Sequence, residues 1–346
     1  MSRTRFGLIA IDLHGAFVRM LQLARTGAEH HVHAWSVFPR LDSKSELASE
    51  IHRILGVIDR RGFNGRALAI CLPDEHVLSA VLDLPPAKSG APVQSIAGAE
   101  IGRMFKHAPD QLELACWELP AASRQAGAAA SMVMACPHNV TDQCAQLFEA
   151  HDFDLRVVEP RAMSLARVCG SADEMQVLIA LGWNQTRFYA VCSGAIVLER
   201  VIENADLQTL HRVVAGTIGL DTDLAATALK DALRAERELL TDPDAAREVQ
   251  DQIRHFVELL TAESLTALSY LSRRFAGRKP ARLLLACDGE EAPDLAREIG
   301  QKLALDARVC SIADYPITDL EPIDPASRRA LAAAAGLCLG HGGGTW

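Results

Sequence analysis

The sequence predicts an α/β protein with two lobes around an interlobe cleft and a small α+β subdomain inserted in the first lobe. A meander of three strand-like segments opens the chain, and a similar meander begins again near residue 176. Helices and further apolar strands follow each meander. The 346 residues are enough for about two domains of ordinary size. The cleft between two such lobes is where a ligand is expected to bind.

The first lobe is expected over residues 1–175. Its opening elements are strands at residues 6–13, 17–23 and 30–38, an amphipathic helix at 45–61 and an apolar strand at 66–73. The order of predicted elements changes at about residues 74–151. A strand, a helix, two strands and another helix there predict the inserted subdomain. A strand at residues 154–160 then returns the chain to the lobe.

The second lobe is expected over residues 176–325. Its meander is followed by a helical insertion at about residues 206–275, in which apolar periodicity predicts helices at 206–217, 221–238 and 245–275. A buried strand, a turn and an amphipathic helix come next, and a last strand covers residues 306–312.

The C-terminal segment, residues 326–346, consists of a helix and a tail that we expect to pack back on the first lobe. The Ala-rich stretch at residues 325–340 predicts a single helix there.

Charge and hydropathy argue against two classes of protein. The net charge is −9 and no basic run is visible, which is unlike a nucleic-acid-binding protein. No apolar stretch is long enough to span a bilayer. Asp12 and His14 interrupt the first apolar segment too early for a signal peptide. We therefore expect a soluble globular protein without direct membrane insertion.

The nine cysteines include no Cys-x-x-Cys pair, and most of them lie inside apolar runs. This pattern favours buried, reduced thiols in a cytosolic protein over disulfides or a zinc site. The sequence also contains no Ser-His-Asp, Walker or dinucleotide-binding signature.

The opening stretch "IAIDLHGAFVRMLQL" reads as two strands joined by a tight turn, with Asp12 before the turn and Gly15 in it. A strand, a turn with small residues and an early carboxylate can hold a phosphate and its metal ion. His14 and Phe17 are bulky residues that such a turn would not select. The pattern therefore leaves open whether the turn binds a nucleotide or only keeps its architecture.

Several segments, taken in order, resemble the actin-like ATPase superfamily and, within it, the PilM-like proteins of type IV pilus assembly. They are "IAIDLHGAFVRMLQL", "FKHAPDQLELACWEL", "LFEAHDFDLRVVEPRAMSLARV", "RLLLACDGEEAPDLAREIGQKLAL" and "LAAAAGLCLG". The resemblance covers nearly the whole chain and rests on the ordered series, because no single segment is specific. It implies two actin-like (ribonuclease H-like) lobes, with residues 74–151 as the extra subdomain also found in FtsA. The cytoplasmic part of the type II secretion protein GspL has a similar fold.

If a nucleotide is bound, the resemblance places it, as ATP with magnesium, between two turns and a third loop. The residues that would contact it are Asp12, Gly15, Arg19, Gly182, Thr186 and Gly289. The sequence departs from the family pattern through bulky residues in both turns, a missing second carboxylate and an acidic third loop. These departures are His14, Phe17, Trp183, Asn184 and Gln185 in the turns, Ala180 at the carboxylate position, and Asp288, Glu290 and Glu291 in the loop.

These changes predict a degenerate nucleotide site, no catalytic residue and no required cofactor. Acidic side chains in the third loop would repel phosphates. We interpret Asp12 as a carboxylate that caps the turn by accepting backbone N–H bonds, in place of a magnesium ligand.

The resemblance implies a non-catalytic scaffold that binds the cytoplasmic N-terminal peptide of a PilN-like single-pass membrane protein. Such a protein would be cytoplasmic and would associate with the inner membrane, and with other components of a pilus or type II secretion platform, through its partners. The peptide is expected in a groove between the first lobe and the inserted subdomain. Candidate groove residues are Leu82, Leu84, Ile101, Met104 and Phe105, which core packing of the subdomain explains equally well.

Two other functions are kept as alternatives. In the first, ATP closes the lobes as a conformational switch or is slowly hydrolysed. This alternative predicts an open cleft on which Asp12, Gly182 and Gly289 converge. The second is a sugar-kinase-like enzyme, which would need a catalytic Asp in the cleft that the sequence does not reveal.

Overall fold

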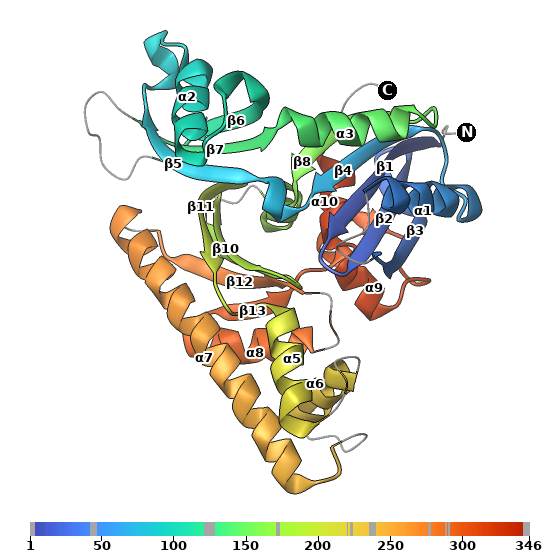
Figure 1. The fold of residues 1–346 in the computed structure, drawn as a ribbon, viewed down its shortest axis with the longest axis vertical. Coiled ribbons are helices and arrows are strands. Elements are labelled where there is room, and N and C mark those ends of the chain that lie inside the picture. Colours follow the sequence, from blue (N-terminus) through green and yellow to red (C-terminus); the bar gives the residue numbers. More distant parts are fainter. Residues whose placement is uncertain are drawn as a thin grey trace.

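The fold is described from a computed structural model (Figure 1). The described residues are 4–41, 47–120, 129–170, 174–219, 221, 224–234, 240–275, 278–287, 289 and 291–341. The predicted acidic residues Asp288 and Glu290, and most of the linker between the two middle strands of the subdomain, lie outside these ranges.

A six-stranded sheet forms the first lobe, in the order β14-β3-β2-β1-β4-β8. Strands β1, β2 and β3 form an antiparallel meander, and β1, β4 and β8 are parallel to one another. The bounds are β1 Arg5–His14, β2 Phe17–Thr26, β3 Glu29–Pro39, β4 Ala67–Leu72, β8 Asp154–Pro160 and β14 Ile317–Thr318.

The second lobe repeats the same arrangement in a five-stranded sheet of order β11-β10-β9-β12-β13. Its meander is again antiparallel, and β12 pairs in parallel with β9 and with β13. The bounds are β9 Met175–Leu181, β10 Thr186–Cys192, β11 Ala195–Ile202, β12 Pro280–Ala286 and β13 Asp306–Val309. The repeated order of elements along the sequence therefore corresponds to two sheets of the same topology.

The inserted subdomain contains a three-stranded antiparallel sheet, ordered β5-β7-β6, which α2 covers on one face. Its elements are β5 Leu78–Leu84, α2 Val93–Phe105, β6 Leu112–Glu118 and β7 Ala129–Pro137. Leu84 and Ile101 are fully buried in its core, and Leu82 packs against them. From the opposite face, the indole Nε1 of Trp117 donates a hydrogen bond to the Ile196 carbonyl oxygen of the second lobe, at 2.9 Å.

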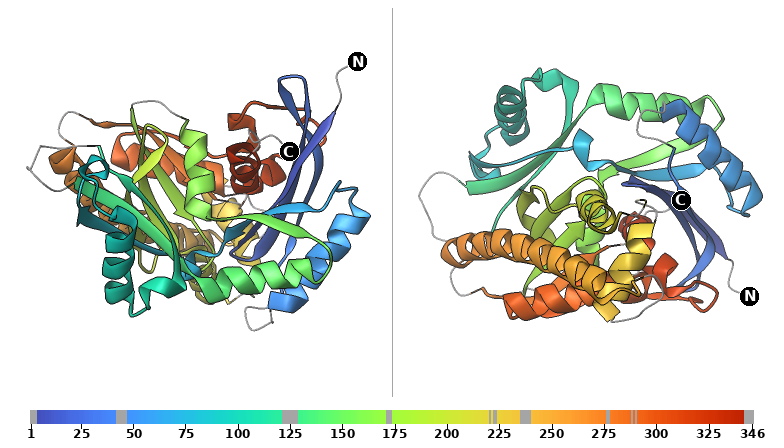
Figure 2. Two further views of the ribbon diagram at one scale, coloured as in Figure 1. Left: turned by 90° about the horizontal axis from the view of Figure 1, so that it is seen from above. Right: turned by 60° about the horizontal axis from the view of Figure 1, so that its bottom comes forward.

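Alternating side chains of β1 serve two different cores. Ile9 and Ile11 point to a core shared with α1 (Leu47–Arg60) and α3 (His138–Glu149). Leu8 and Ala10 point to the core that contains α4 (Arg161–Ala166) and α10 (Ala332–Gly340). The C-terminal helix α10 packs on β1, β2, β4 and α4, as the views from two further directions also indicate (Figure 2). Asp12, two residues beyond Ala10, shares the α4 side of the sheet.

The remaining helices surround the two lobes. Their bounds are α1 Leu47–Arg60, α3 His138–Glu149, α4 Arg161–Ala166, α5 Leu207–Ile218, α6 Ala225–Arg234, α7 Pro243–Arg274, α8 Ala292–Leu303, α9 Pro325–Ala330 and α10 Ala332–Gly340. Helix α7 has 32 residues and is capped at its N-terminus by Asp242, whose side chain accepts a hydrogen bond from the Asp244 amide. All nine cysteines are free and eight of them are buried, as the sequence predicted.

One sequence-based expectation about the elements was wrong, and one strand was missed. The single helix expected near the C-terminus is divided at Leu331, whose ψ of 0° departs from the value near −42° of a regular α-helix. Strand β14, which pairs with β3, was not predicted, because two residues carry no periodicity. The lobe boundaries remain a prediction.

Gly336 permits the close packing of α10 on α4. A Cβ atom there would lie inside contact distance of the Ser164 carbonyl oxygen and 2.9 Å from the Tyr315 hydroxyl. We expect Gly336→Ala to lower the free energy of unfolding by about 1–3 kcal/mol, because the backbone oxygen cannot move away freely. Urea denaturation followed by circular dichroism measures this change.

The matched control is Gly216→Ala in α5, where an added Cβ would meet nothing within 4 Å. This control is expected to raise the free energy of unfolding by about 0.5–1 kcal/mol, because alanine restricts the unfolded chain. Equal effects of the two substitutions would contradict the packing argument.

Candidate functional site

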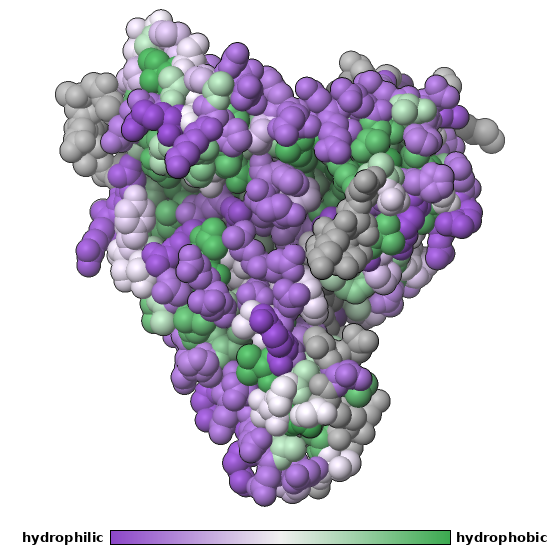
Figure 3. All heavy atoms as spheres, viewed as in Figure 1, coloured by the Kyte–Doolittle hydropathy of each residue, from purple (hydrophilic) through white to green (hydrophobic). Residues whose placement is uncertain are grey.

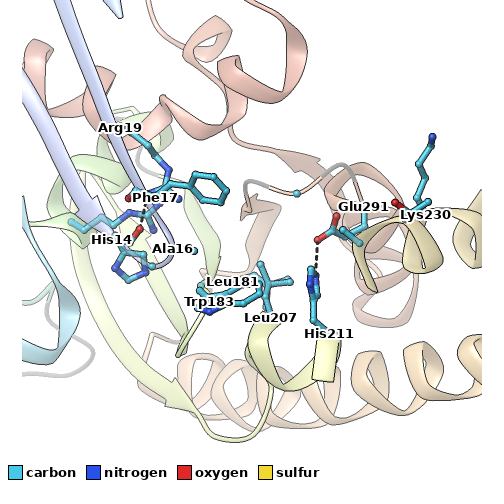
Figure 4. A pocket seen from close by; sticks show the side chains of 16 residues that line it. His14, Ala16, Phe17, Arg19, Leu181, Trp183, Leu207, His211, Lys230 and Glu291 are labelled. Carbon is cyan, nitrogen blue, oxygen red and sulfur yellow. Dashed lines mark hydrogen bonds and ion pairs between the residues drawn. The ribbon is translucent and has the colours of Figure 1, made fainter. Parts of the chain in front are cut away.

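A cavity of about 660 Å³ lies between the two lobes. The turn after β1 forms one wall, and α5, α6 and the loop before α8 form the other (Figure 4). Strands β1, β4 and β8 are parallel, so their carboxyl ends meet at the same edge of the first sheet. Ligands of open α/β sheets bind at such edges. The cavity is therefore the candidate site.

Four of the six predicted nucleotide-contacting residues line this cavity: Gly15, Arg19, Gly182 and Gly289. The other two do not. The Asp12 side chain is fully buried behind the cavity wall, and the buried Thr186 hydroxyl donates a hydrogen bond to the Ala205 carbonyl oxygen, at 2.5 Å. The three glycines and Arg19 therefore lie together at the cavity, whereas the Asp12 carboxylate and the Thr186 hydroxyl are buried outside its lining.

Asp12 is held by two arginines. The Arg161 Nε donates a hydrogen bond to Asp12 Oδ2 at 3.0 Å, and Arg19 Nη1 lies 3.7 Å from the same oxygen. Asp12 Oδ1 accepts no hydrogen bond from the described residues. The interpretation of Asp12 as a turn-capping carboxylate was therefore wrong, because its partner is a guanidinium that reaches it from α4.

Arg19 supports the turn itself. Its Nη1 donates hydrogen bonds to the carbonyl oxygens of His14, at 2.7 Å, and Phe17, at 3.1 Å. Burial lowers the pKa of Arg19 to about 10, which keeps the guanidinium charged at neutral pH. Burial and the nearby charges of Arg161 and Arg19 lower the pKa of His14 well below its usual value, so His14 is neutral there.

The two turns approach each other closely across the cleft. A Cβ added to Gly15 would lie 3.3 Å from the Trp183 Cβ, and one added to Gly182 would lie 2.9 Å from the His14 Nε2. The bulky residues that depart from the family pattern therefore fill the space between the glycines. This contact narrows the space between the two turns at the side of the cavity.

The third loop is closed in a similar way. The carboxylate of Glu291 folds over Gly289, where it would overlap any added Cβ atom. Glu291 is buried and its Oε1 lies 3.8 Å from His211 Nε2. The His211 ring packs edge-on against Trp183, with 5.1 Å between ring centroids.

A buried charge cluster ties the lobes together beside the cavity. Arg187 on β10 lies 3.4 Å from the Asp74 carboxylate of the first lobe and donates to its carbonyl oxygen at 3.1 Å. Arg187 also forms an ion pair with Glu199. Burial raises the pKa of Asp74 to about 6, against the attraction of Arg187.

These residues do not fit a magnesium–nucleotide complex. The Asp12 carboxylate already faces two guanidinium groups, and Ala180, at the predicted second carboxylate position, is a buried apolar residue. Among the described residues, no group of three His, Cys, Asp or Glu side chains could hold a metal ion. We therefore derive no chemical step through magnesium or ATP.

Sequence reasoning missed Arg161, Asp74, His211 and Lys230. Arg161 and Asp74 carried a usable signal, since each follows the end of an apolar parallel strand and so belongs to the same sheet edge as Asp12. His211 and Lys230 belong to α5 and α6, and nothing in helical periodicity indicates that they face a cavity.

Breaking the Asp12–Arg161 pair should destabilise the fold. We expect Asp12→Asn to lower the free energy of unfolding by about 3–5 kcal/mol in EDTA, because Arg161 would stay buried without its carboxylate. The double variant Asp12→Asn/Arg161→Gln is the control and should lose less than the single variants together. Urea denaturation in EDTA measures both. A loss below about 1 kcal/mol for Asp12→Asn would contradict the structural role of the pair.

No protein-family model matches the sequence, and no curated protein matches it. Solved structures do match. One is the PilM–PilN type IV pilus biogenesis complex, with a TM-score of 0.74, 14% identity, and coverage of 96% of this chain and 98% of that chain.

Two further structures match at lower scores. MreB5 of Spiroplasma citri bound to ADP has a TM-score of 0.55 and 10% identity over 98% of this chain and 96% of that chain. The ethanolamine utilization protein EutJ of Carboxydothermus hydrogenoformans has a TM-score of 0.51 and 13% identity over 97% and 89%. Identities this low establish the fold only. The predicted fold class is confirmed: the chain has a two-lobed actin-like fold and resembles PilM over nearly its whole length.

Proposed function

We propose that this protein is a non-catalytic scaffold of a type IV pilus or type II secretion platform that binds a peptide from a membrane partner. The observation that carries this proposal is the likeness to the PilM–PilN complex over 96% of the chain. The poor fit of the cleft to a magnesium–nucleotide complex supports a binding role over a catalytic one.

The inserted subdomain offers two features for binding an extended peptide. Strand β5 is at the edge of its sheet and, among the described strands, has a hydrogen-bonded neighbour on one side only. An extended segment can pair with such an edge. Large apolar side chains are also exposed here: Val81 on β5, and Met104 and Phe105 at the end of α2. Figure 3 shows hydrophobic atoms in the recess between this subdomain, at upper left, and the rest of the molecule.

The five predicted groove residues have different roles in this proposal. Met104, which is 50% exposed, and Phe105, which is 37% exposed, are available for direct contact. Leu82 on β5 is partly buried and packs against the core of the subdomain. Leu84 and Ile101 are core residues, so they would support the surface without touching the peptide.

The partner in this proposal is the cytoplasmic N-terminus of a PilN-like single-pass membrane protein. No helix in the described part of the chain is long and apolar enough to cross a bilayer. Association with the inner membrane, and with other platform components, would then depend on protein partners.

Replacing the two exposed side chains should weaken peptide binding. We expect Met104→Asp/Phe105→Asp to raise the Kd for a synthetic peptide of the PilN-like N-terminus by about tenfold or more, because buried contacts of large side chains dominate such interfaces. Isothermal titration calorimetry measures the Kd. The matched control is Leu265→Asp on α7, which is 48% exposed on the second lobe and should bind the peptide normally. Absence of binding to the unmodified protein would reject the adaptor function.

An ATP-dependent switch is the second candidate. The cavity favours it, because its 660 Å³ suits a ligand of nucleotide size and Gly15, Gly182 and Gly289 all line it. This function requires the two turns to separate and magnesium to bind, since phosphates need both the space and the counter-charge. Slow hydrolysis would further need a carboxylate to orient water.

Calorimetric titration with Mg-ATP and with ATP in EDTA tests this candidate. Binding that requires magnesium would support the switch, and release of phosphate would support hydrolysis. Absence of magnesium-dependent binding would reject both.

A further inference from the structure

We propose that the end of helix α7, the loop after it and the start of β12 form a basic surface that contacts the anionic lipid headgroups of a membrane. The members of this basic surface are Arg273, Arg274, Arg278, Lys279 and Arg282. The inference deepens the proposed function, on which it rests, because a partner with a membrane span would hold the chain close to a bilayer. The contact is peripheral: it adds to the protein partner and inserts no segment.

The basic surface differs in charge from the rest of the chain. Between Glu263 and Asp288 the sequence contains these five basic residues and no acidic residue. The chain as a whole has 35 Lys and Arg residues against 44 Asp and Glu. No uninterrupted basic run marks the surface, because apolar and small residues separate most of its members. A bilayer with negative headgroups would attract this part of the chain and repel most of the remainder, so the charge distribution favours one orientation.

Three members of the basic surface have no partner that accounts for their charge. Arg273, Arg274 and Lys279 form no hydrogen bond or ion pair within the described part of the chain. The side chains of Arg273 and Lys279 are exposed, and that of Arg274 is partly buried. Basic residues in the last turn of a helix interact favourably with its terminal carbonyl groups. This effect accounts in part for Arg273 and Arg274 but not for Lys279, which lies beyond the helix.

The other two members each have one partner. Arg278 Nη1 donates a hydrogen bond to Cys192 Sγ at 2.7 Å. Arg282 Nε lies 3.4 Å from Asp306 Oδ2, and both of these side chains are exposed, so the pair is accessible to water and weak. Within the described part of the chain, Asp306 is the one carboxylate paired with the basic surface. Its single charge leaves the surface strongly positive.

A groove of about 510 Å³ beside Arg273 adds an aromatic side chain to the basic surface. Two charged residues of β11 line this groove, and both are already paired: Glu199 with Arg187, and Arg200 with Glu263. Tyr270 also lines the groove, one helical turn before Arg273, and is 45% exposed. Tyrosine is enriched at the headgroup level of bilayers, because its ring is apolar and its hydroxyl is polar. A tyrosine beside unpaired basic groups therefore favours a lipid surface over a purely polar anion.

The basic surface lies on the same side of the molecule as the proposed peptide site. Figure 1 and both views of Figure 2 show the C-terminal end of α7 on the side where the inserted subdomain lies. Trp117 of the subdomain is hydrogen-bonded to Ile196 of β11, and β11 lines the same groove as Arg273. A membrane protein bound at β5 would therefore bring its bilayer to the side of the chain that carries the basic surface.

Co-sedimentation of the full chain with lipid vesicles tests the proposal. One set of vesicles is phosphatidylcholine with about one third phosphatidylglycerol, and the other is phosphatidylcholine alone. We expect binding to the anionic vesicles that weakens by about tenfold or more between about 50 and 300 mM NaCl, because salt screens the attraction. No binding to the anionic vesicles, or equal binding to both sets, would overturn the proposal.

A matched pair of double variants connects vesicle binding to the basic surface. Arg273→Gln/Lys279→Gln should weaken binding by about twentyfold, at about fivefold for each basic residue lost near an anionic bilayer. The control Arg247→Gln/Arg254→Gln removes the same charge near the other end of the 32-residue α7, from arginines that are 71% and 62% exposed. It should change binding by less than about twofold, because this end is several screening lengths away. Equal losses in the two variants would overturn the assignment to this surface.

An acidic protein is the alternative occupant of the basic surface, and soluble polyglutamate is its probe. Polyglutamate binding that is lost in Arg273→Gln/Lys279→Gln, together with no vesicle binding, would overturn the lipid contact.

Peptide titration separates this proposal from the proposed function. Arg273→Gln/Lys279→Gln should bind the PilN-like peptide with the Kd of the unmodified protein. A weaker peptide affinity in this variant would mean that the basic surface belongs to the peptide site, and would overturn the lipid contact. Vesicle binding by an unmodified protein that binds no peptide would support the lipid contact and reject the adaptor function alone.

Discussion

The ion pair between Asp12 and Arg161 determines what the interlobe site can do. It joins the end of β1 to the start of α4 across 149 positions of sequence, and both side chains are buried. A buried carboxylate is costly unless its charge is compensated. Here the guanidinium of Arg161 compensates the charge of Asp12. The position that could hold a metal ion in an actin-like fold is therefore already paired with a positive charge. The chemistry of the cleft follows from that one pairing.

The other departures from the family pattern also place side chains against the glycines of the cleft. His14 approaches Gly182, Trp183 approaches Gly15, and Glu291 covers Gly289, so each glycine has a side chain from elsewhere in the site against it. Arg187 then fastens the second lobe to Asp74 of the first. Side chains thus make the contacts between the lobes, around a cavity that remains large enough for a ligand.

Most of the fold could be predicted from the sequence, because its strands and helices have clear periodicity. The strands of both meanders, the helix of the inserted subdomain and the 32-residue α7 are all encoded in local patterns of apolar residues. The glycines of the site were also predictable, because a turn that approaches a ligand needs a residue without a side chain. The two-residue β14 and the interruption at Leu331 were not, because they depend on contacts made only in the folded chain.

The partners of the site residues could not be predicted for the same reason. Asp12 was a candidate site residue, but its ion-pair partner is Arg161, which lies 149 positions away in the sequence, and local periodicity does not pair residues so far apart. Glu291 was expected to repel a ligand from an open loop, whereas it is buried against Gly289 and near His211. In both cases the sequence shows the acidic residue but not the side chain that faces it in the folded chain, which is Arg161 for Asp12 and His211 for Glu291.

The inserted subdomain, where we propose that a peptide binds, is physically connected to the cleft. The sheet of the subdomain packs its second face against the second lobe: Met132 and Met134 of β7 belong to the large core, and Trp117 donates a hydrogen bond to Ile196 on β11. A peptide bound along β5 would therefore pair with a sheet that contacts β11. Strand β11 in turn pairs with β10, whose Arg187 joins the two lobes.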